Sequence, residues 1–148
     1  MAEKPIIVGI AGGSGSGKTT LAERICRVMG SRAANLGIDS FYRDLTPEEF
    51  ENVLEFDFDH PDAVDWDDCC AAIEKLKKRE ETPIPLYSYS QYKRTGTEII
   101  QPADIIIVEG MFALQNERIR NLLDLKIFVH TDDEDRLARR ILRDVETR

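Results

Sequence analysis

A glycine-rich segment near the N-terminus carries residues whose order and spacing suit the binding of a nucleotide phosphate. The run from Gly12 to Thr19 matches the pattern G-x-x-x-x-G-K-[ST]. Glycines let successive backbone N–H groups turn towards a phosphate, and a helix that begins after them adds the positive end of its dipole. In this pattern the lysine reaches the β- and γ-phosphates and the following hydroxyl ligates Mg²⁺. We therefore predict an ATP-binding loop that comprises Gly12, Gly13, Ser14, Gly15, Ser16, Gly17, Lys18, Thr19 and Thr20.

Two carboxylates are predicted to lie beside this loop, each at the end of an apolar run. Asp39 follows residues 35–38 and Glu109 follows residues 105–108. In open α/β sheets, ligands bind beyond the carboxyl ends of the strands. Phosphoryl transfer needs a group that accepts the proton of the substrate hydroxyl and a carboxylate that helps to hold Mg²⁺. We assign the first role to Asp39 and the second to Glu109, while either residue taken alone is also compatible with a helix or turn cap.

The remaining sequence excludes several classes of nucleotide-binding protein. It contains no Asn-Lys-x-Asp motif, which a GTPase would use to recognise guanine, and a chain of 148 residues is too short for a motor or large ATPase. The net charge of −8 disfavours a nucleic-acid partner, whose footprint would be basic. No apolar run approaches the ~18 residues of a membrane span, so no membrane partner is expected. A small-molecule kinase remains.

Length and composition predict one globular domain over residues 1–148, because 42% of the residues are apolar and 32% are charged. The N-terminus does not resemble a secretory signal, and the three cysteines are too few and badly spaced for a zinc site or a disulfide framework. We therefore expect a cytoplasmic location. Charge is segregated, because residues 44–68 hold eleven acids without Lys or Arg, whereas arginines gather at the C-terminus: Arg136, Arg139, Arg140, Arg143 and Arg148.

Hydrophobic periodicity predicts strands that alternate with helices, which is typical of an α/β fold with a parallel sheet. We expect a P-loop NTPase fold with a mostly parallel five-stranded sheet, flanked by helices, and a small β-hairpin around Thr95-Gly96. The expected buried strands of the sheet cover residues 6–10, 33–38, 105–108 and 125–130, and the arms of the hairpin cover residues 83–89 and 97–100. The expected helices cover residues 18–29, 66–79 and 132–145, and a further short helix begins at Thr46.

Five motifs resemble those of the uridine–cytidine kinases, in the same order and at similar spacing. They are Asp39-Ser-Phe-Tyr42, Phe58-Asp-His-Pro-Asp-Ala63, Pro85-Leu-Tyr87, Val108-Glu-Gly110 and Arg139-Arg-Ile-Leu-Arg-Asp144. The resemblance covers essentially the whole chain, and the second motif separates this family from phosphoribulokinase, pantothenate kinase and nicotinamide riboside kinase. The resemblance implies ATP-dependent phosphorylation of uridine or cytidine at the 5′-hydroxyl, a reaction of pyrimidine salvage. It also implies Mg²⁺ as the cofactor, GTP as an alternative phosphate donor, and assembly of the protein as a homo-tetramer.

The resemblance also implies roles for individual residues. Asp39 is the catalytic base, assisted by Lys18 and Arg143, and Mg²⁺ is held by Thr19, Glu109 and Asp39. The base is enclosed by Tyr42, Phe58, Tyr87 and Tyr89, the ribose hydroxyls are bound by Asp59 and Arg140, and the phosphates are contacted by Arg143 and Arg148. An aromatic cluster offers stacking surfaces, and a carboxylate accepts hydrogen bonds from vicinal hydroxyls.

Several other aromatic and charged residues have a structural interpretation beside the functional one. We interpret Phe56 as a core residue and His60 as a structural hydrogen bonder, while Arg136 and Arg139 suit a solvated helix face as well as a ligand contact. The whole chain is also compatible with a related P-loop small-metabolite kinase or a catalytically weak nucleotide-binding regulator.

Three positions depart from the family pattern. Tyr92 replaces a histidine that contacts the base, which suggests a preference for cytidine. His130 replaces an acid after a strand, and we interpret it as a surface change. The chain ends at Arg148, inside the arginine-rich segment, so we expect the lid and the elements after it to be truncated.

Overall fold

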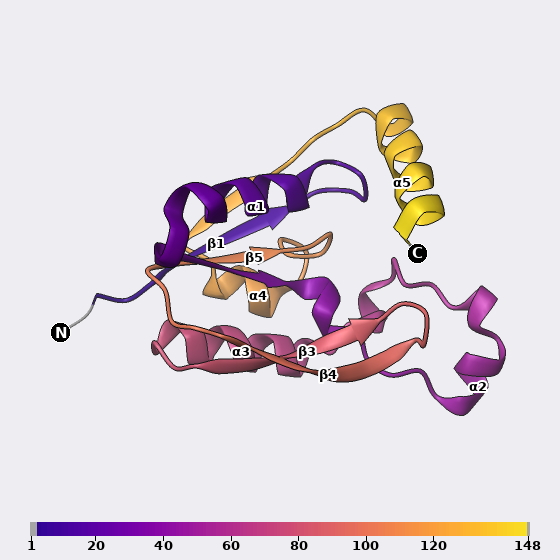
Figure 1. Ribbon diagram of the computed structural model, residues 1–148, viewed down its shortest axis with the longest axis horizontal. Coiled ribbons are helices and arrows are strands. Elements are labelled where there is room, and N and C mark those ends of the chain that lie inside the picture. The colour runs from indigo at the N-terminus through magenta and orange to yellow at the C-terminus, as the bar shows by residue number, and fades with distance from the viewer. Residues whose placement is uncertain (1–2, 148) are drawn as a thin grey trace.

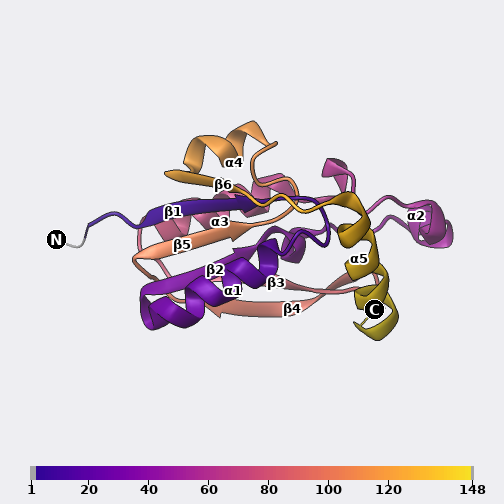
Figure 2. The ribbon, with the colours of Figure 1, turned by 90° about the horizontal axis from the view of Figure 1, so that it is seen from above.

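A parallel sheet of four strands lies at the centre of the computed structural model, which describes residues 3–147 (Figure 1). Its strand order is β2-β5-β1-β6, and Figure 2 shows these strands side by side from above. The bounds are β1 Ile6–Ala11, β2 Ala33–Gly37, β5 Ile105–Glu109 and β6 Leu125–Phe128. The two inner strands, β1 and β5, have near-continuous apolar sequences because helices cover both of their faces.

Helices cover the sheet on both sides, as Figure 1 shows. α1 packs on one face, where Ala22 is buried in one cluster with Val8, Ile10 and Ile107 of the strands. α3 and α4 cover the other face. The helices are α1 Lys18–Met29, α2 Pro47–Glu51, α3 Trp66–Lys77, α4 Glu117–Leu122 and α5 Asp133–Thr147, with 3-10 helices at Gly30–Arg32, Ile38–Phe41, Val53–Glu55 and Pro61–Ala63. No helix among residues 3–147 has the length and apolar character of a membrane span.

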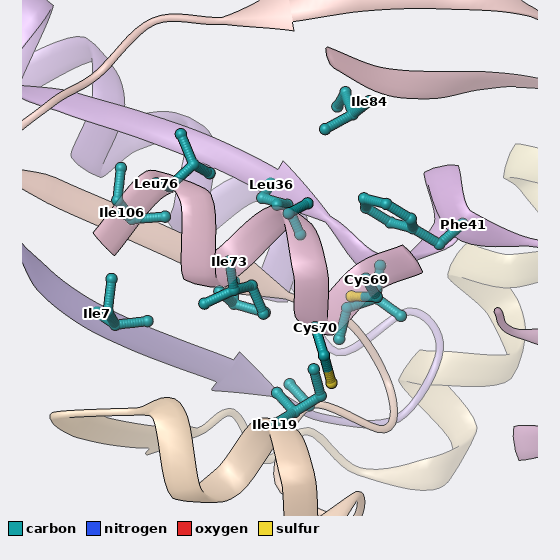
Figure 3. Packing of buried hydrophobic residues seen from close by; sticks show 14 of the residues in the cluster. Ile7, Leu36, Phe41, Cys69, Cys70, Ile73, Leu76, Ile84, Ile106 and Ile119 are labelled. Carbon is teal, nitrogen blue, oxygen red and sulfur yellow. The ribbon is translucent and has the colours of Figure 1, made fainter. Parts of the chain in front are cut away.

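The larger core lies between α3 and the sheet (Figure 3). Ile73 and Leu76 of α3 are fully buried in one cluster with Ile7 and Ile106 of the sheet. Side chains from the hairpin and from α4 complete this cluster. Asp65 caps the N-terminus of α3, since its carboxylate accepts a hydrogen bond from the Asp68 backbone N–H, as its sequence position predicts.

The structure corrects three expectations about the strands. The described sheet has four strands rather than five. The hairpin, β3 Thr82–Ser88 with β4 Lys93–Ile100, turns between these strands and not at Thr95-Gly96. Gly96 pairs with Leu86 inside the hairpin and Thr95 is left unpaired, so the predicted turn is a β-bulge. β6 is an edge strand that pairs only with β1 in the described sheet, which leaves Leu125 and Phe128 exposed rather than buried.

The core position of Ile73 leads to a stability prediction. Replacing Ile73 by Ala removes a fully buried side chain, and we expect the free energy of unfolding to fall by ~2–5 kcal/mol because a cavity remains. Urea unfolding measures this loss. Leu54→Ala is the control, since that side chain is 97% exposed and its truncation should change the free energy by no more than ~0.5 kcal/mol. Equal losses in both variants would contradict the packing described above.

Candidate functional site

The glycine-rich loop joins the end of β1 to the start of α1, which is the context that a phosphate-binding loop requires. Gly15 and Gly17 have φ angles of 76° and 96°, in the left-handed region that favours glycine, and Gly17 is the N-terminal cap of α1. The Ser16 backbone N–H closes the turn by donating to the Gly13 carbonyl over 3.1 Å. Lys18, the first residue of the helix, is buried at 8% exposure. The N-terminus of α1 and the ammonium group of Lys18 therefore lie together at this loop.

The two predicted carboxylates lie beside this loop because their strands are neighbours in the sheet. Glu109 is the last residue of β5 and is buried, and Asp39 lies in the 3-10 helix that directly follows β2. The Thr19 hydroxyl donates a hydrogen bond to the Glu109 carboxylate. Burial raises the pKa of the Glu109 carboxyl above its ordinary value, and the Thr19 hydrogen bond and the Lys18 charge oppose this rise.

The oxygens of Thr19 and Glu109 suit a hard cation such as Mg²⁺. In the described part of the chain, however, no group of three or more His, Cys, Asp and Glu side chains could hold a metal by itself. A site with so few carboxylate ligands fits Mg²⁺, which is usually bound through one or two carboxylates together with substrate phosphates and water.

Two cavities meet beside the loop. The first has a volume of about 560 Å³ and the second about 880 Å³. The first contains four aromatic rings in its wall and is lined by Ser14, Lys18, Asp39, Tyr42, Phe58, Asp59, Tyr89, Ser90, Tyr92, Met111, Arg140, Arg143 and Asp144. We call it the aromatic cavity. The second, the loop cavity, includes Gly15, Gly17, Lys18, Thr19, Thr20, Asp39, Glu109, Arg139, Arg140 and Arg143 in its wall.

Four residues line both cavities: Lys18, Asp39, Arg140 and Arg143. The junction thus combines one carboxylate with three cationic side chains from distant parts of the sequence. A carboxylate can accept a proton there, and the cations can stabilise negative charge that develops on a transferring group.

Tyr42 is the centre of the aromatic cluster. Its ring makes edge contacts with Phe58, Tyr87 and Tyr89, at centroid distances of 5.5, 5.3 and 6.4 Å. Tyr87 supports the cluster from behind and does not line the aromatic cavity, although the sequence suggested that it encloses the base. Burial raises the pKa of the Tyr87 phenol to about 12.

Phe56, which was expected in the core, is only partly buried, as Phe58 is, and the two rings differ instead in their contact with the aromatic cavity. Phe58 lines the aromatic cavity, whereas Phe56 lines neither of the two cavities and packs against the core. The rings make an edge contact at 4.7 Å, and the Arg43 guanidinium lies 5.3 Å from the Phe56 ring centroid. Phe56 therefore supports Phe58 from the side away from the cavity.

Asp59 and Arg140, the two predicted ribose ligands, contact each other in the wall of the aromatic cavity. A nitrogen of the Arg140 guanidinium lies 2.8 Å from the Asp59 carboxylate. Arg140 also reaches Asp144 at 3.3 Å, as does Arg143. The ion pair joins α5 to the segment that precedes α3, so that α5 closes one side of the cavity.

Arg136 and Arg139, which the sequence left undecided, both contact the loop. Arg136 Nε donates to the Ser14 carbonyl over 3.1 Å, and Arg139 donates to the Gly15 carbonyl over 3.3 Å. A Cβ on Gly13 would lie 2.0 Å from the Arg136 guanidinium, so this glycine permits the close approach. The three- and four-residue spacing of the arginines along α5 is the sequence signal that could have indicated one common face.

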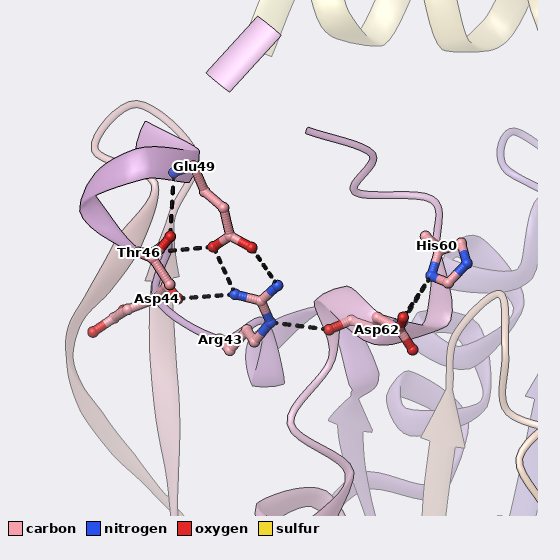
Figure 4. A network of polar contacts seen from close by, with 6 residues as sticks. All are labelled: Arg43, Asp44, Thr46, Glu49, His60 and Asp62. Carbon is pink, nitrogen blue, oxygen red and sulfur yellow. Dashed lines mark hydrogen bonds and ion pairs between the residues drawn. The ribbon is translucent and has the colours of Figure 1, made fainter. Parts of the chain in front are cut away.

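A polar network around Arg43 holds the acidic segment that carries Phe58 and Asp59 (Figure 4). Arg43 binds the Glu49 carboxylate through two contacts of 2.8 and 2.9 Å, which lowers the pKa of Glu49 to about 2. It also donates to the Asp62 carbonyl over 3.0 Å. His60 Nδ1 accepts a hydrogen bond from the Asp62 backbone N–H, which confirms the structural role predicted for this histidine.

Three residues in the wall of the aromatic cavity belong to none of the predicted roles: Ser90, Met111 and Asp144. Ser90 and Met111 had no detectable sequence signal, since neither residue type marks a site by itself. Asp144 closes the arginine-rich motif and could have been found by its position one turn after Arg140. Arg148 lies outside the described residues.

Known proteins resemble this chain over nearly its whole length. The model of the phosphoribulokinase/uridine kinase family matches residues 7–148. A uridine kinase of Lactobacillus helveticus is 44% identical over 149 aligned residues, which cover 99% of this chain and 71% of that protein. A uridine kinase of Geobacillus kaustophilus is 42% identical over 150 residues, covering all of this chain and 71% of that protein. The chain belongs to the phosphoribulokinase/uridine kinase family.

Solved structures agree on the fold. The phosphoribulokinase from Rhodobacter spheroides has a TM-score of 0.71 at 20% identity, covering 99% of this chain and 58% of that one. The D-glycerate 3-kinase from Cryptococcus neoformans has a TM-score of 0.64 at 17% identity, covering 97% and 71%. The fold is that of the P-loop kinases, and membership of the family implies ATP-dependent phosphoryl transfer.

The buried Glu109 leads to a prediction about pH and stability. Its folded-state pKa is raised, so the folded protein binds the proton more tightly than the unfolded chain does, and stability falls as pH rises from 4.5 through the folded pKa. Glu109→Gln removes this fall and keeps a carbonyl oxygen that can accept the Thr19 hydrogen bond. We expect the melting temperature of Glu109→Gln, measured without nucleotide or metal, to exceed that of the parent at pH 7 by more than at pH 4.5. A difference that is the same at both pH values would contradict this account.

Proposed function

We propose that this protein transfers the γ-phosphoryl group of ATP to the 5′-hydroxyl of a pyrimidine nucleoside. The junction of the two cavities carries this proposal, because a carboxylate and three cations lie between a phosphate-binding loop and an aromatic cavity of nucleoside size. The uridine kinases that the chain resembles act by name on such a nucleoside. GTP is an alternative donor in the same loop.

In the proposed reaction the nucleoside occupies the aromatic cavity and the triphosphate occupies the loop cavity. Asp39, which lines both, accepts the proton of the 5′-hydroxyl as its oxygen attacks the γ-phosphorus and the bond to the β-phosphate oxygen breaks. Lys18 and Arg143 stabilise the negative charge on the transferring group and on the leaving diphosphate. ADP and the nucleoside 5′-monophosphate are the products.

We infer that Mg²⁺ is held on the loop side by Thr19 and Glu109, with Asp39 in the wall of the same cavity. The bound ion would supply charge neutralisation at the phosphates. Burial of Glu109 beside Lys18 keeps the carboxylate in a fixed place, so little reorganisation is required when the nucleotide binds.

We infer that the base stacks among Tyr42, Phe58 and Tyr89, which line the aromatic cavity. Asp59 accepts hydrogen bonds from the ribose hydroxyls and Arg140 donates to them. Because these two side chains form an ion pair at 2.8 Å, the ribose meets a carboxylate and a guanidinium that are already oriented towards each other.

Asp39→Asn tests the proposed reaction. The amide keeps the shape of the side chain and loses its basicity, so kcat for ADP release with a pyrimidine nucleoside should fall by at least ~100-fold, with a modest change in nucleoside KM. The control is Asp67→Asn, an exposed carboxylate on α3 that binds Arg118. An Asp39→Asn variant that keeps kcat and loses nucleoside affinity would make Asp39 a binding residue and would refute its role as base.

A restriction to cytidine is a second candidate, and the position of Tyr92 favours it. Tyr92 has a φ of 54°, unusual for a residue with a side chain, and its ring is stacked on Phe58 at 5.8 Å in the wall of the aromatic cavity. A phenol has one hydrogen, and its lone pairs favour the cytosine amino group over the O4 acceptor of uracil when that hydrogen is engaged. A neutral histidine, with one donor and one acceptor nitrogen, would serve either base.

The measurement is kcat/KM for cytidine and for uridine in the parent and in Tyr92→His. We expect the parent to prefer cytidine and the histidine variant to reduce that preference by about tenfold, because an unpaired polar contact discriminates strongly between the two bases. A parent that uses both nucleosides equally, or a ratio that the substitution leaves unchanged, would show that Tyr92 is only a packing residue.

A further inference from the structure

Arg94, near the start of β4, joins parts of the chain that carry different sides of the aromatic cavity. We propose that Arg94 is a positioning residue for nucleoside binding. It does not line the aromatic cavity, and it acts through the groups that do. This proposal rests on the proposed function, because it concerns the affinity for the nucleoside in the same cavity.

The guanidinium of Arg94 binds the backbone on which the central tyrosine is mounted. Its Nε donates to the Tyr42 carbonyl over 3.1 Å, and Nη2 reaches the Phe41 carbonyl over 3.4 Å. Phe41 is 1% exposed and anchors this segment in the core. Since Asp39 lies only three residues before Tyr42, Arg94 holds the backbone that bears both a cavity wall and the proposed base.

Carboxylates hold the same guanidinium from the other side. Nη1 lies 2.8 Å from Asp68 and Nη2 lies 3.7 Å from Asp65, both at the start of α3. The Arg94 backbone N–H donates to the Asp44 carboxylate over 2.8 Å. One residue of the hairpin is therefore attached to the segment around Tyr42 and to the N-terminus of α3.

The cavity needs such an attachment because its aromatic walls come from separate elements. Tyr89 and Tyr92 lie in the turn of the hairpin, whose strands form a sheet of their own, while Tyr42 makes an isolated bridge with Val64. In the described residues no strand pairing connects the hairpin to the segment around Tyr42. The Arg94 hydrogen bonds supply a polar connection, alongside the ring contacts between tyrosines.

The β-bulge of the hairpin lies next to Arg94. Tyr87 pairs with Arg94 and Leu86 pairs with Gly96, which leaves Thr95 as the extra residue. A bulge bends a strand locally and changes the direction of the neighbouring side chains. Tyr87 touches the Tyr42 ring at 5.3 Å, so the paired residues Tyr87 and Arg94 approach the same segment, one through its ring and one through its guanidinium.

Arginine suits this position better than lysine does. Its planar group has five donors in a fixed fork and can serve carbonyls and carboxylates at once, whereas an ammonium group offers a single point of charge. The Arg94 side chain is 25% exposed, so its hydrogen bonds are partly shielded from water. Losing the fork should therefore loosen the cavity walls even if the charge remains.

Binding measurements on Arg94→Gln, Arg94→Lys and the parent test the proposal. By isothermal titration calorimetry, we expect the Kd for cytidine and for uridine to rise by about tenfold or more in Arg94→Gln, because charge-assisted hydrogen bonds are lost. The rise should be smaller in Arg94→Lys, which keeps the charge. The Kd for ATP with Mg²⁺ should rise by much less than the nucleoside Kd in both variants, because Arg94 does not line the loop cavity and bonds to backbone carbonyls beyond Asp39.

Arg79→Gln is the matched control. Its side chain is 27% exposed and binds Asp104 and the Glu3 carbonyl, away from both cavities. If Arg94→Gln does not fold, Arg94→Lys provides the comparison with the parent.

Four outcomes would overturn the proposal. An unchanged nucleoside Kd in the Arg94 variants would show that the cavity does not depend on this residue. A loss of ATP affinity as large as the loss of nucleoside affinity, or an equal loss in Arg79→Gln, would reveal only a general effect on the fold. A parent that binds ATP and neither nucleoside would instead refute the proposed function, and this proposal with it.

Discussion

The parallel pairing of β1, β5 and β2 is the constraint on which the site depends. Parallel strands end at the same edge of a sheet, so the register that pairs both Ile10 and Gly37 with Glu109 also places the segments after these strands beside one another. The phosphate-binding loop comes after β1, Glu109 closes β5, and Asp39 comes two residues after β2. Thr19, in the first turn of α1, then reaches the Glu109 carboxylate. The sheet thus places the loop, the carboxylates and a hydroxyl together before any ligand binds.

Charge balance shapes the rest of the site. The acidic segment between Asp44 and Asp68 would repel itself if it stood alone, and arginines from other elements oppose it. Arg43 holds Glu49, Arg94 holds Asp68, and Arg140 holds Asp59. Arginines of α5 meanwhile bond to carbonyls of the phosphate-binding loop. The same helix therefore contacts a region that binds anions and a region that is itself anionic, and this double contact sets α5 across the junction of the two cavities.

Sequence patterns predicted the parts of this structure that depend on local signals. The loop motif, the apolar runs of β1 and β5, and the caps at Asp65 and Thr46 each carry their information within a few residues. The failures lie where distant contacts decide. Thr95-Gly96 has the composition of a turn, but the pairing of Gly96 with Leu86 makes it a bulge. The run at β6 is apolar, yet its edge position in the described sheet leaves Leu125 exposed. Nor does any local pattern show that Arg136 and Arg139 meet loop residues that lie 122 and 124 positions earlier in the chain.

The geometry of the aromatic cavity could not be predicted from local sequence patterns either. Its rings come from separate segments, with Tyr42 after β2, Phe58 in the acidic segment and Tyr92 in the hairpin turn. The aromatic residues can be identified in the sequence. The distances between their rings, however, are determined by contacts between different segments, such as the Phe58–Tyr92 stack at 5.8 Å. The loop cavity is built on the sheet and its geometry is determined by strand register. The aromatic cavity is built on loops, so its geometry depends on the polar and ring contacts that hold those loops together, and substitutions outside the cavity can therefore change its shape.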